Sequence, residues 1–347
     1  GCPLSCAWCH NPESINPQQE FFFDVEKCER CGACATICPE GAIGAPVERK
    51  RIQEPEVVPL ISSSGSIIDR LNDGSFGTEG TFDNYLYMAQ RAELVKEQPP
   101  PEMSPPVFDR EKCTNCMKCL EACSYEALYL ASHQRTLDDV YEEVLADNLF
   151  YETSGGGWTI SGGEPLLQSD VTLALLKRAK ADGINTALDT TGFLPWKTIA
   201  RVLPYVDLVL FDVKVLDEDK HKKWTGVSNT LILENLKKIA AAGKPIRLRC
   251  VVVHNVNYWE PEHPRAVVEL AKSLGESVVG IDIMPFHNFA ENKYDRLGLD
   301  YIFKGFPNLF NEDVEEYKTI MEQAGRWKPS LGGLAARENT VEMVGNR

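Results

Sequence analysis

The segment Trp158-Thr-Ile-Ser-Gly-Gly-Glu-Pro165 decides the fold, because a short apolar run ends there in two glycines, a carboxylate and a proline. Four further apolar runs follow, and helical patterns separate them. Buried, non-alternating strands separated by helices are typical of a parallel sheet, either doubly wound or barrel-like. The predicted strands are Trp158–Ser161, Ile184–Asp189, Leu208–Val213, Ile246–Val253 and Val278–Met284, and the predicted helices are Leu137–Phe150, Leu166–Ala181, Trp196–Val202, Leu231–Ala242 and Glu262–Leu274.

Composition narrows the class of protein. A chain of 347 residues can form one large domain with an insert. Its formal net charge of −15 argues against a nucleic-acid binder, because phosphate contacts need clustered Lys and Arg. The sequence contains no apolar run long enough for a membrane span and no export signal. We therefore expect a cytoplasmic protein without membrane or nucleic-acid partners.

Cysteine is the most informative residue type. Eleven of the twelve cysteines fall into three tight groups, which is metal-ligand spacing and not the pattern of a small secreted disulfide protein. The first group, Cys2, Cys6 and Cys9, offers three thiolates. Three ligands on a [4Fe–4S] cube leave one iron open for a small molecule. The alternative is a zinc site that His10 completes.

The other two groups have the spacing of bacterial ferredoxins. Cys28, Cys31, Cys34 and Cys38 are followed by Pro39, and Cys113, Cys116, Cys119 and Cys123 by Ser124, where the usual proline is missing. Such runs hold fully ligated [4Fe–4S] cubes, which pass electrons but leave no iron open. The twelfth cysteine, Cys250, is predicted to be a buried core residue.

These groups divide the chain into three parts. Residues 1–20 form a cysteine-bearing loop, residues 21–130 form a two-cluster insert, and residues 131–347 form the main α/β part and a tail. Within the insert, residues 44–106 form a long polar interval, rich in Gly, Ser and Pro, that is either a docking surface for the partner or reductant or, as the composition favours, a spacer. A helical pattern from Phe82 to Val95 predicts one ordered element in that interval.

Polar residues stand where the predicted strands end. They include Glu164, the Asp189-Thr190 pair, the Asp212 and Lys214 pair, Arg249 and His287. In a barrel these ends meet at one face, where chemistry gathers. Taken singly, each residue has a plainer interpretation, such as a helix cap, a turn or a solvated charge. Five polar strand ends in succession favour a shared ligand site.

The stretch from Gly1 to Glu13, GCPLSCAWCHNPE, together with Gly162-Gly163-Glu164-Pro165, resembles the radical S-adenosylmethionine (SAM) enzymes that activate glycyl radical enzymes. The resemblance implies a partial (β/α)6 TIM-like barrel with a ferredoxin-like insert and three [4Fe–4S] clusters. It implies that Cys2, Cys6 and Cys9 carry the catalytic cluster, that Cys28, Cys31, Cys34 and Cys123 hold a second, and that Cys113, Cys116, Cys119 and Cys38 hold a third. The implied SAM contacts are Trp8, His10, Gly162, Gly163, Glu164, Asp189, Thr190, Asp212, Lys214, Arg249 and His287, with a monovalent cation among Asp189, Thr190 and Asp212. Thr191 stands where those activases often carry Asn, so no direct contact is expected from its side chain.

The activity that this resemblance implies is reductive cleavage of SAM to a 5′-deoxyadenosyl radical, which removes a hydrogen atom from a backbone glycine of a partner glycyl radical enzyme. A low-potential donor such as flavodoxin or ferredoxin would supply the electron. The alternatives are a radical SAM peptide or protein maturase with auxiliary clusters, a ferredoxin-type electron carrier, and a purely structural iron–sulfur protein. The position of the extra cysteines, between the first loop and the barrel, favours the activases.

The predicted strand count leads to one further expectation. Only five strands are predicted after the insert, whereas the family's partial barrel has six. Gly1 also stands directly before the first cluster cysteine. We therefore expect an amino-terminal truncation that lacks the first barrel strand and leaves an unpaired sheet edge.

Overall fold

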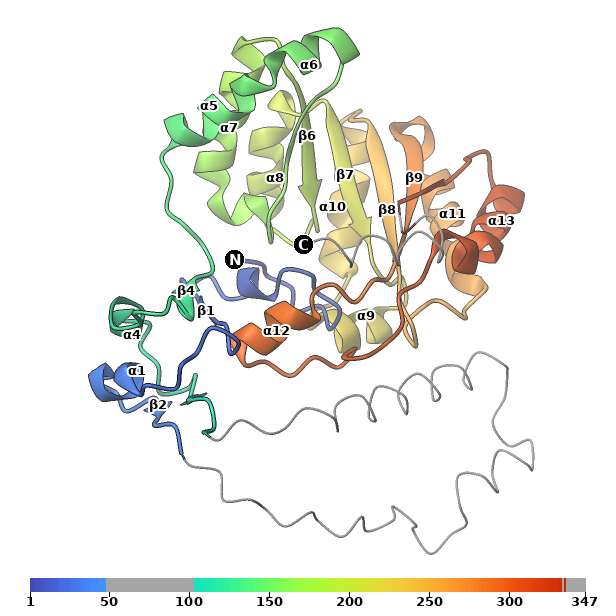
Figure 1. Ribbon diagram of the computed structural model, residues 1–347. Coiled ribbons are helices and arrows are strands. Elements are labelled where there is room, and N and C mark those ends of the chain that lie inside the picture. The colour runs from blue at the N-terminus through green and yellow to red at the C-terminus, as the bar shows by residue number, and fades with distance from the viewer. Residues whose placement is uncertain (48–102, 333, 335–347) are drawn as a thin grey trace, which may run out of the picture.

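The computed structural model describes residues 1–47, 103–332 and 334. Its largest unit is a curved sheet of six parallel strands in the order β10-β9-β8-β7-β6-β5, with helices along its outer face (Figure 1). The arrangement is a half-barrel. Its strands are β5 (Gly157–Ile160), β6 (Asn185–Thr190), β7 (Leu208–Val213), β8 (Ile246–Val252), β9 (Val278–Pro285) and β10 (Ser330–Leu331). Its helices are α5 (Leu137–Ala146), α6 (Asn148–Ser154), α7 (Ser169–Ala181), α8 (Trp196–Val202), α9 (Glu218–Thr225), α10 (Thr230–Ala241), α11 (Glu262–Leu274), α12 (Glu291–Leu297) and α13 (Glu315–Ala324).

Side chains of the central strands alternate between two environments. In β8, Leu248 and Cys250 are fully buried under the helices, whereas Arg247 and Arg249, which alternate with them, point to the concave side and are partly exposed. β6 and β7 alternate in the same way. The expectation of non-alternating strands was therefore wrong, because the half-barrel leaves its concave face open and polar. That face carries the functional site.

The sixth strand, β10, comes from Ser330–Leu331 and pairs with β9. It lies after the insert, so the count of five strands on which the expected truncation rested was wrong. A strand of two residues is too short to give a hydrophobic pattern. β5 forms the opposite edge of the sheet.

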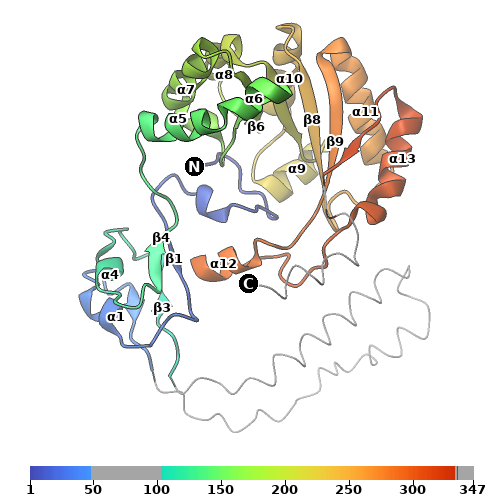
Figure 2. The same ribbon diagram turned by 45° about the horizontal axis from the view of Figure 1, so that its top comes forward.

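The insert is a separate small unit beside the half-barrel (Figure 2). Two antiparallel pairs hold it together: β1 (Phe21–Phe23) with β4 (Leu128–Leu130), and β2 (Ile43–Gly44) with β3 (Val107–Phe108). Two short helices, α1 (Ala33–Ile37) and α4 (Lys118–Glu121), each carry the third cysteine of one run. Its small core contains Phe21, Ile43 and Leu128 together with Cys119.

Most predicted helices of the half-barrel are confirmed. The single helix predicted from Leu137 to Phe150 is instead divided at Asp147 into α5 and α6. Helices α9, α12 and α13 were not predicted. The predicted helix Phe82–Val95 lies outside the described residues. In the part of the chain that the structure describes, no helix is both long and apolar enough to cross a membrane.

Candidate active site

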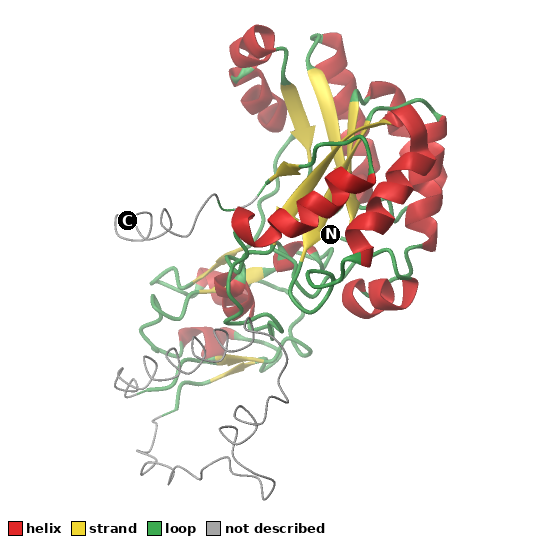
Figure 3. Ribbon diagram, turned by 90° about the vertical axis from the view of Figure 1, so that its right-hand side faces the viewer, coloured by secondary structure: helices red, strands yellow, loops and turns green. Residues whose placement is uncertain are grey.

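The loop that carries Cys2, Cys6 and Cys9 lies at the carboxyl ends of the strands, beside α12 (Figure 1). Figure 3 shows the strands of the half-barrel with helices packed along one side of them. Backbone hydrogen bonds fix it at both sides of the half-barrel. The Glu164 amide donates to the Gly1 carbonyl at 2.9 Å. On the other side, the amides of Ser5 and Ala7 donate to carbonyls at the end of α9, at 2.9 and 3.0 Å. The loop is thus held by the β5 turn and by α9.

A cavity of about 280 Å³ opens between this loop and the concave face of the sheet. It is lined by almost every residue that the sequence predicted for the SAM site, namely Cys2, Cys6, Trp8, Cys9, His10, Gly162, Gly163, Asp189, Thr190, Asp212, Lys214, Arg249 and His287. The three thiols and the polar strand ends therefore share one space. Glu164 is the one predicted residue that does not line it.

Two carboxylates and two cations face each other in this cavity. Lys214 Nζ lies 3.0 Å from Asp212 Oδ2, and Arg249 binds Asp189 directly while remaining 4.0 Å from Asp212. Burial raises the pKa of Asp189, and the nearby Asp212 adds to that rise while Arg249 opposes it. Burial alone would lower the pKa of Lys214, but Asp212 and Cys6 together raise it. Lys214 is therefore a permanent cation.

Such a set of charges fits the methionine part of SAM. An α-amino group needs carboxylate or carbonyl acceptors, and an α-carboxylate needs cationic donors. The cavity offers both within a few ångströms of one another. Gly162 has φ near +157°, and a Cβ added to it would have no neighbour within 4 Å, so its backbone lies open to a ligand.

Gly163, unlike Gly162, is closely surrounded by other atoms. A Cβ at this position would lie 2.6 Å from the Gly1 carbonyl oxygen and 2.8 Å from Ser14 Oγ. Only a residue without a side chain can pack so closely against the cysteine loop. The second glycine therefore seats the loop, while the first faces the cavity.

Glu164 is turned away from the cavity and is only 2% exposed. Its carboxylate accepts hydrogen bonds from the Thr191 amide and hydroxyl, both at 2.8 Å, and from Thr190 Oγ1 at 3.0 Å. The Leu166 amide donates a further bond at 3.2 Å. Burial raises the pKa of this carboxyl, and the bonds from Thr191 oppose the rise. These bonds hold the carboxylate in place without SAM, and its predicted contact with SAM stays a prediction.

Aromatic rings form the other wall of the cavity. The rings of His10 and His287 lie 3.9 Å apart, and His10 Nε2 is 2.9 Å from the His287 carbonyl oxygen. His287 Nδ1 is buried and has no hydrogen-bond partner among the described residues. Burial lowers the pKa of His287 to about 4, so the ring is neutral. His287 lines the cavity together with Trp8 and His10, and this group of rings fits a nucleobase.

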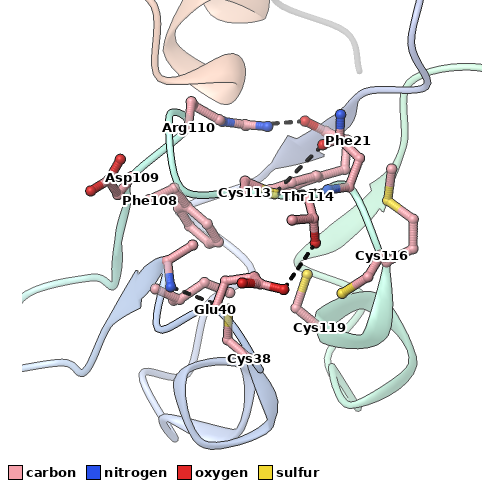
Figure 4. A pocket seen from close by; sticks show the side chains of 14 residues that line it. Phe21, Cys38, Glu40, Phe108, Asp109, Arg110, Cys113, Thr114, Cys116 and Cys119 are labelled. Carbon is pink, nitrogen blue, oxygen red and sulfur yellow. Dashed lines mark hydrogen bonds between the residues drawn. The ribbon is translucent and has the colours of Figure 1, made fainter.

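The insert contains two smaller hollows, each lined by four cysteines. One is lined by Cys38, Cys113, Cys116 and Cys119, and the other by Cys28, Cys31, Cys34 and Cys123. Figure 4 shows the first hollow, with Cys38 from the first run facing cysteines of the second. Each hollow thus combines three cysteines of one run with the fourth of the other. This is the grouping that the resemblance to two-cluster ferredoxins implied.

Helix α12 connects the cysteine loop to the insert. Lys293 Nζ lies 2.6 Å from Glu13 and 2.9 Å from Asn11, both in the loop. One turn further, Arg296 lies 3.3 Å from Asp24 and 3.0 Å from the Tyr129 hydroxyl, both in the insert. One short helix therefore contacts both cysteine-bearing parts of the chain.

Known proteins match the chain along nearly its whole length. The radical SAM superfamily profile matches residues 118–267, and two 4Fe-4S binding domain profiles match residues 21–44 and 105–128. The (2S)-3-sulfopropanediol dehydratase activating enzyme of Klebsiella oxytoca is 33% identical over 307 residues, which are 88% of this chain and 80% of that protein. The chain belongs to the glycyl radical enzyme activating enzymes. It is a radical SAM enzyme whose activity is the activation of a glycyl radical enzyme.

Other activating enzymes cover even more of the chain. The choline trimethylamine-lyase activating enzyme of Oleidesulfovibrio alaskensis is 31% identical and covers 93% of this chain and 87% of its own length. The trans-4-hydroxy-L-proline dehydratase activating enzyme of Clostridioides difficile is 30% identical and covers 96% and 91%. These relatives favour activation over the maturase and the electron-carrier alternatives.

The geometry also weakens the zinc alternative for this activating enzyme. Among residues 1–47, 103–332 and 334, no three Cys, His, Asp or Glu side chains converge on the position of a single metal ion. His10 Nε2 is already engaged with the His287 carbonyl. This hydrogen bond fastens the cysteine loop to the segment that follows β9.

Sequence reasoning missed three residues of the activating enzyme's site. Ser161 donates to Asp189 at 3.0 Å, the Met284 sulfur lies 3.2 Å from Arg249 Nε, and Thr191 anchors Glu164. Ser161 and Met284 could have been found, because both lie on the concave side by the two-residue period of their strands. Thr191 was set aside because its family counterpart is often Asn, and no signal in a single sequence indicates a buried glutamate as its partner.

Proposed function

We propose that this activating enzyme carries three [4Fe–4S] clusters. Cys2, Cys6 and Cys9 would hold the cube with the open iron, and the two cysteine hollows of the insert would hold one fully ligated cube each. The observation that carries the proposal is the single cavity in which the three loop thiols face the predicted SAM contacts. The four-cysteine lining of each hollow supports the auxiliary clusters. In this proposal residues 1–20 hold the catalytic cube, residues 21–130 hold the two auxiliary cubes, and residues 131–347 supply the remaining SAM contacts.

When bound, the open-iron cube supplies the electron that cleaves SAM to methionine and a 5′-deoxyadenosyl radical. Asp189, Asp212, Lys214 and Arg249 bind and orient the methionine part through its two charged groups. Trp8, His10 and His287 hold the adenine ring, with His287 Nδ1 as an acceptor or donor set by its tautomer. Asp189, Thr190 and Asp212 also offer the oxygen ligands for a monovalent cation.

Orientation is the main contribution of the chain to the chemistry. The partner's glycine has to lie close to the 5′ carbon of SAM before cleavage, since proximity decides which hydrogen atom is removed. The carboxyl ends of the strands, where the cavity opens, are the side from which a substrate loop would enter. We propose a glycyl radical enzyme as protein substrate, a flavodoxin or ferredoxin as electron donor, and the cytoplasm as the compartment.

The test combines metal content with turnover. After anaerobic reconstitution we expect about twelve irons per chain, from three cubes of four. Reduced enzyme with SAM should then form 5′-deoxyadenosine, and with the partner a glycyl radical detectable by electron paramagnetic resonance (EPR). A content near eight irons would show that one cysteine hollow holds no cube. No 5′-deoxyadenosine from fully loaded enzyme would contradict the SAM site.

A further inference from the structure

Each cysteine hollow of the insert contains one arginine. Arg110 lines the hollow of Cys38, Cys113, Cys116 and Cys119, and Arg30 lines the hollow of Cys28, Cys31, Cys34 and Cys123. A guanidinium beside four cysteines can meet negative charge beyond a carboxylate partner such as Glu20, which pairs with Arg110. Cluster-bound thiolates would provide that charge.

Contacts of Arg110 with neighbouring residues use its two Nη atoms and leave its Nε–H without an acceptor in the described part of the chain. Its Nη1 donates to Glu20 at 3.2 Å, its Nη2 donates to the Phe21 carbonyl at 3.3 Å, and its guanidinium lies 3.9 Å above the Phe21 ring. Its Nε is buried and has no hydrogen-bond partner among the described residues. Figure 4 shows the side chain at the rim of the cysteine hollow, with its guanidinium directed to the Phe21 carbonyl. A buried guanidinium N–H without an acceptor is costly, so this donor calls for a ligand inside the hollow.

Arg30 also has a buried Nε without a hydrogen-bond partner among the described residues, but it stands at a different position relative to its cysteines. It stands two residues after Cys28, with φ of +54°, and its amide lies 3.4 Å from the Cys28 sulfur. Its Nη1 lies 3.4 Å from the Cys28 carbonyl oxygen, whereas its Nε is again buried without a partner within the described part of the chain. The corresponding residue of the second run is Asn115, whose side chain donates to Gln18 and accepts from the Cys113 thiol at 3.5 Å. The two arginines therefore do not occupy equivalent positions in the two cysteine runs. Each hollow has its Nε–H from a different place in the sequence.

We propose that Arg30 and Arg110 each donate an Nε–H hydrogen bond to one auxiliary [4Fe–4S] cube and raise its reduction potential, one arginine for each cube. The inference rests on the proposed presence of both cubes. Hydrogen bonds to cluster sulfurs and nearby positive charge stabilise the reduced, more negative state of a cube. The arginines would thereby keep both auxiliary cubes reducible by a cellular donor in an otherwise acidic protein.

The test is a redox titration of the reconstituted full chain, followed by EPR. In Arg110→Met we expect one auxiliary signal to shift to lower potential, with about tenfold less reduced cube at a fixed ambient potential, which is 59 mV for a one-electron couple. In Arg30→Met the other auxiliary signal should shift by a similar amount. The signal that responds to added SAM should keep its potential in both variants. Lys112→Met is the matched control, because Lys112 is an exposed cation next to Cys113 that pairs with Asp109 at 2.9 Å and does not line the hollow.

Two results would overturn the inference: auxiliary potentials that move no further than in Lys112→Met, or one variant that shifts all signals alike. If Arg110→Met or Arg30→Met loses a cube, the variants Arg110→Lys and Arg30→Lys provide the test. They keep the charge but not the Nε–H, so the cube should be retained at a potential between those of wild type and Met, and a wild-type potential would exclude the hydrogen bond. Iron content separates this inference from the proposed function: a wild-type chain with fewer than three cubes would contradict the proposed function, whereas three cubes whose potentials do not respond to the arginine substitutions would contradict this inference alone.

Discussion

The substitution Glu164→Ala tests whether the Glu164 carboxylate stabilises the fold or binds SAM directly. In the structure this carboxylate joins the β5 turn to Thr190 and Thr191 and does not line the SAM cavity. The substitution should therefore destabilise the fold first and weaken SAM binding only through the displaced turn. A glutamate that contacts SAM directly would give the reverse order of effects.

The magnitude follows from the donors that the substitution leaves behind. Two buried backbone amides, those of Leu166 and Thr191, lose their acceptor, whereas the hydroxyls of Thr190 and Thr191 can rotate toward other acceptors. Each unsatisfied buried group costs about 1–3 kcal/mol, so the free energy of unfolding should fall by about 2–6 kcal/mol. That is a large share of the roughly 5–15 kcal/mol that is typical of a domain.

The assay is anaerobic urea unfolding of Glu164→Ala, Thr191→Val and the double variant, with SAM affinity measured by calorimetry on the folded proteins. Thr191→Val removes the hydroxyl that donates to Glu164 and keeps the amide, so the two substitutions share one hydrogen bond and should not be additive, with a coupling energy of about 1 kcal/mol. An unchanged unfolding free energy in Glu164→Ala, together with SAM binding weakened tenfold or more, would refute this reasoning and return the side chain to the ligand site.

Three further predictions concern other parts of the site and fold. Cys6→Ala should abolish 5′-deoxyadenosine formation, while Cys116→Ala should leave the SAM-responsive EPR signal in place and slow its reduction; activity in the Cys6 variant would contradict the cluster assignment. Lys214→Ala should weaken SAM binding by about 10- to 150-fold, the equivalent of one charged hydrogen bond of about 1.5–3 kcal/mol, and calorimetry that finds unchanged affinity would remove Lys214 from the site. His263 is buried, and burial lowers its pKa to about 4. Because the unfolded chain binds this proton more readily, stability should be retained above the unfolded pKa of about 6.5 and should fall by about 2 kcal/mol between about pH 7 and pH 5. His263→Gln should lack that loss in denaturant unfolding, and an unchanged pH slope would assign it to other groups.

Strand positions in the half-barrel could be predicted from the sequence because each is a compact apolar run between helical patterns. All five predicted strands of the half-barrel appear within one or two residues of their expected ends. β10 could not be predicted, since two residues carry no period. Helix α9 was missed for a related reason: its sequence EDKHKKWT is mostly charged, and only His221 and Thr225 of its residues are buried.

The site was predictable wherever a residue faces the cavity from the end of a strand. Asp189, Asp212 and Arg249 meet because parallel strands bring their carboxyl ends to one edge, which follows from topology alone. The direction in which Glu164 points was not predictable. It depends on a turn in which Pro165 begins a short 3-10 helix and the carboxylate caps that helix through the Leu166 amide. The spacing of residues in the sequence does not predict the direction in which a side chain in such a turn points.

The anchoring of the cysteine loop has a consequence for how the protein is made. The contact of His10 with His287 spans 277 residues of chain, and that of Glu13 with Lys293 spans 280. At about 5–20 residues per second, a ribosome needs roughly 14–55 s to synthesise the intervening chain. During that time the first three thiols leave the ribosome without the residues that will fasten their loop. We expect iron delivery to this loop to follow release of the finished polypeptide, and a nascent chain stalled before His287 to lack its SAM-responsive cube.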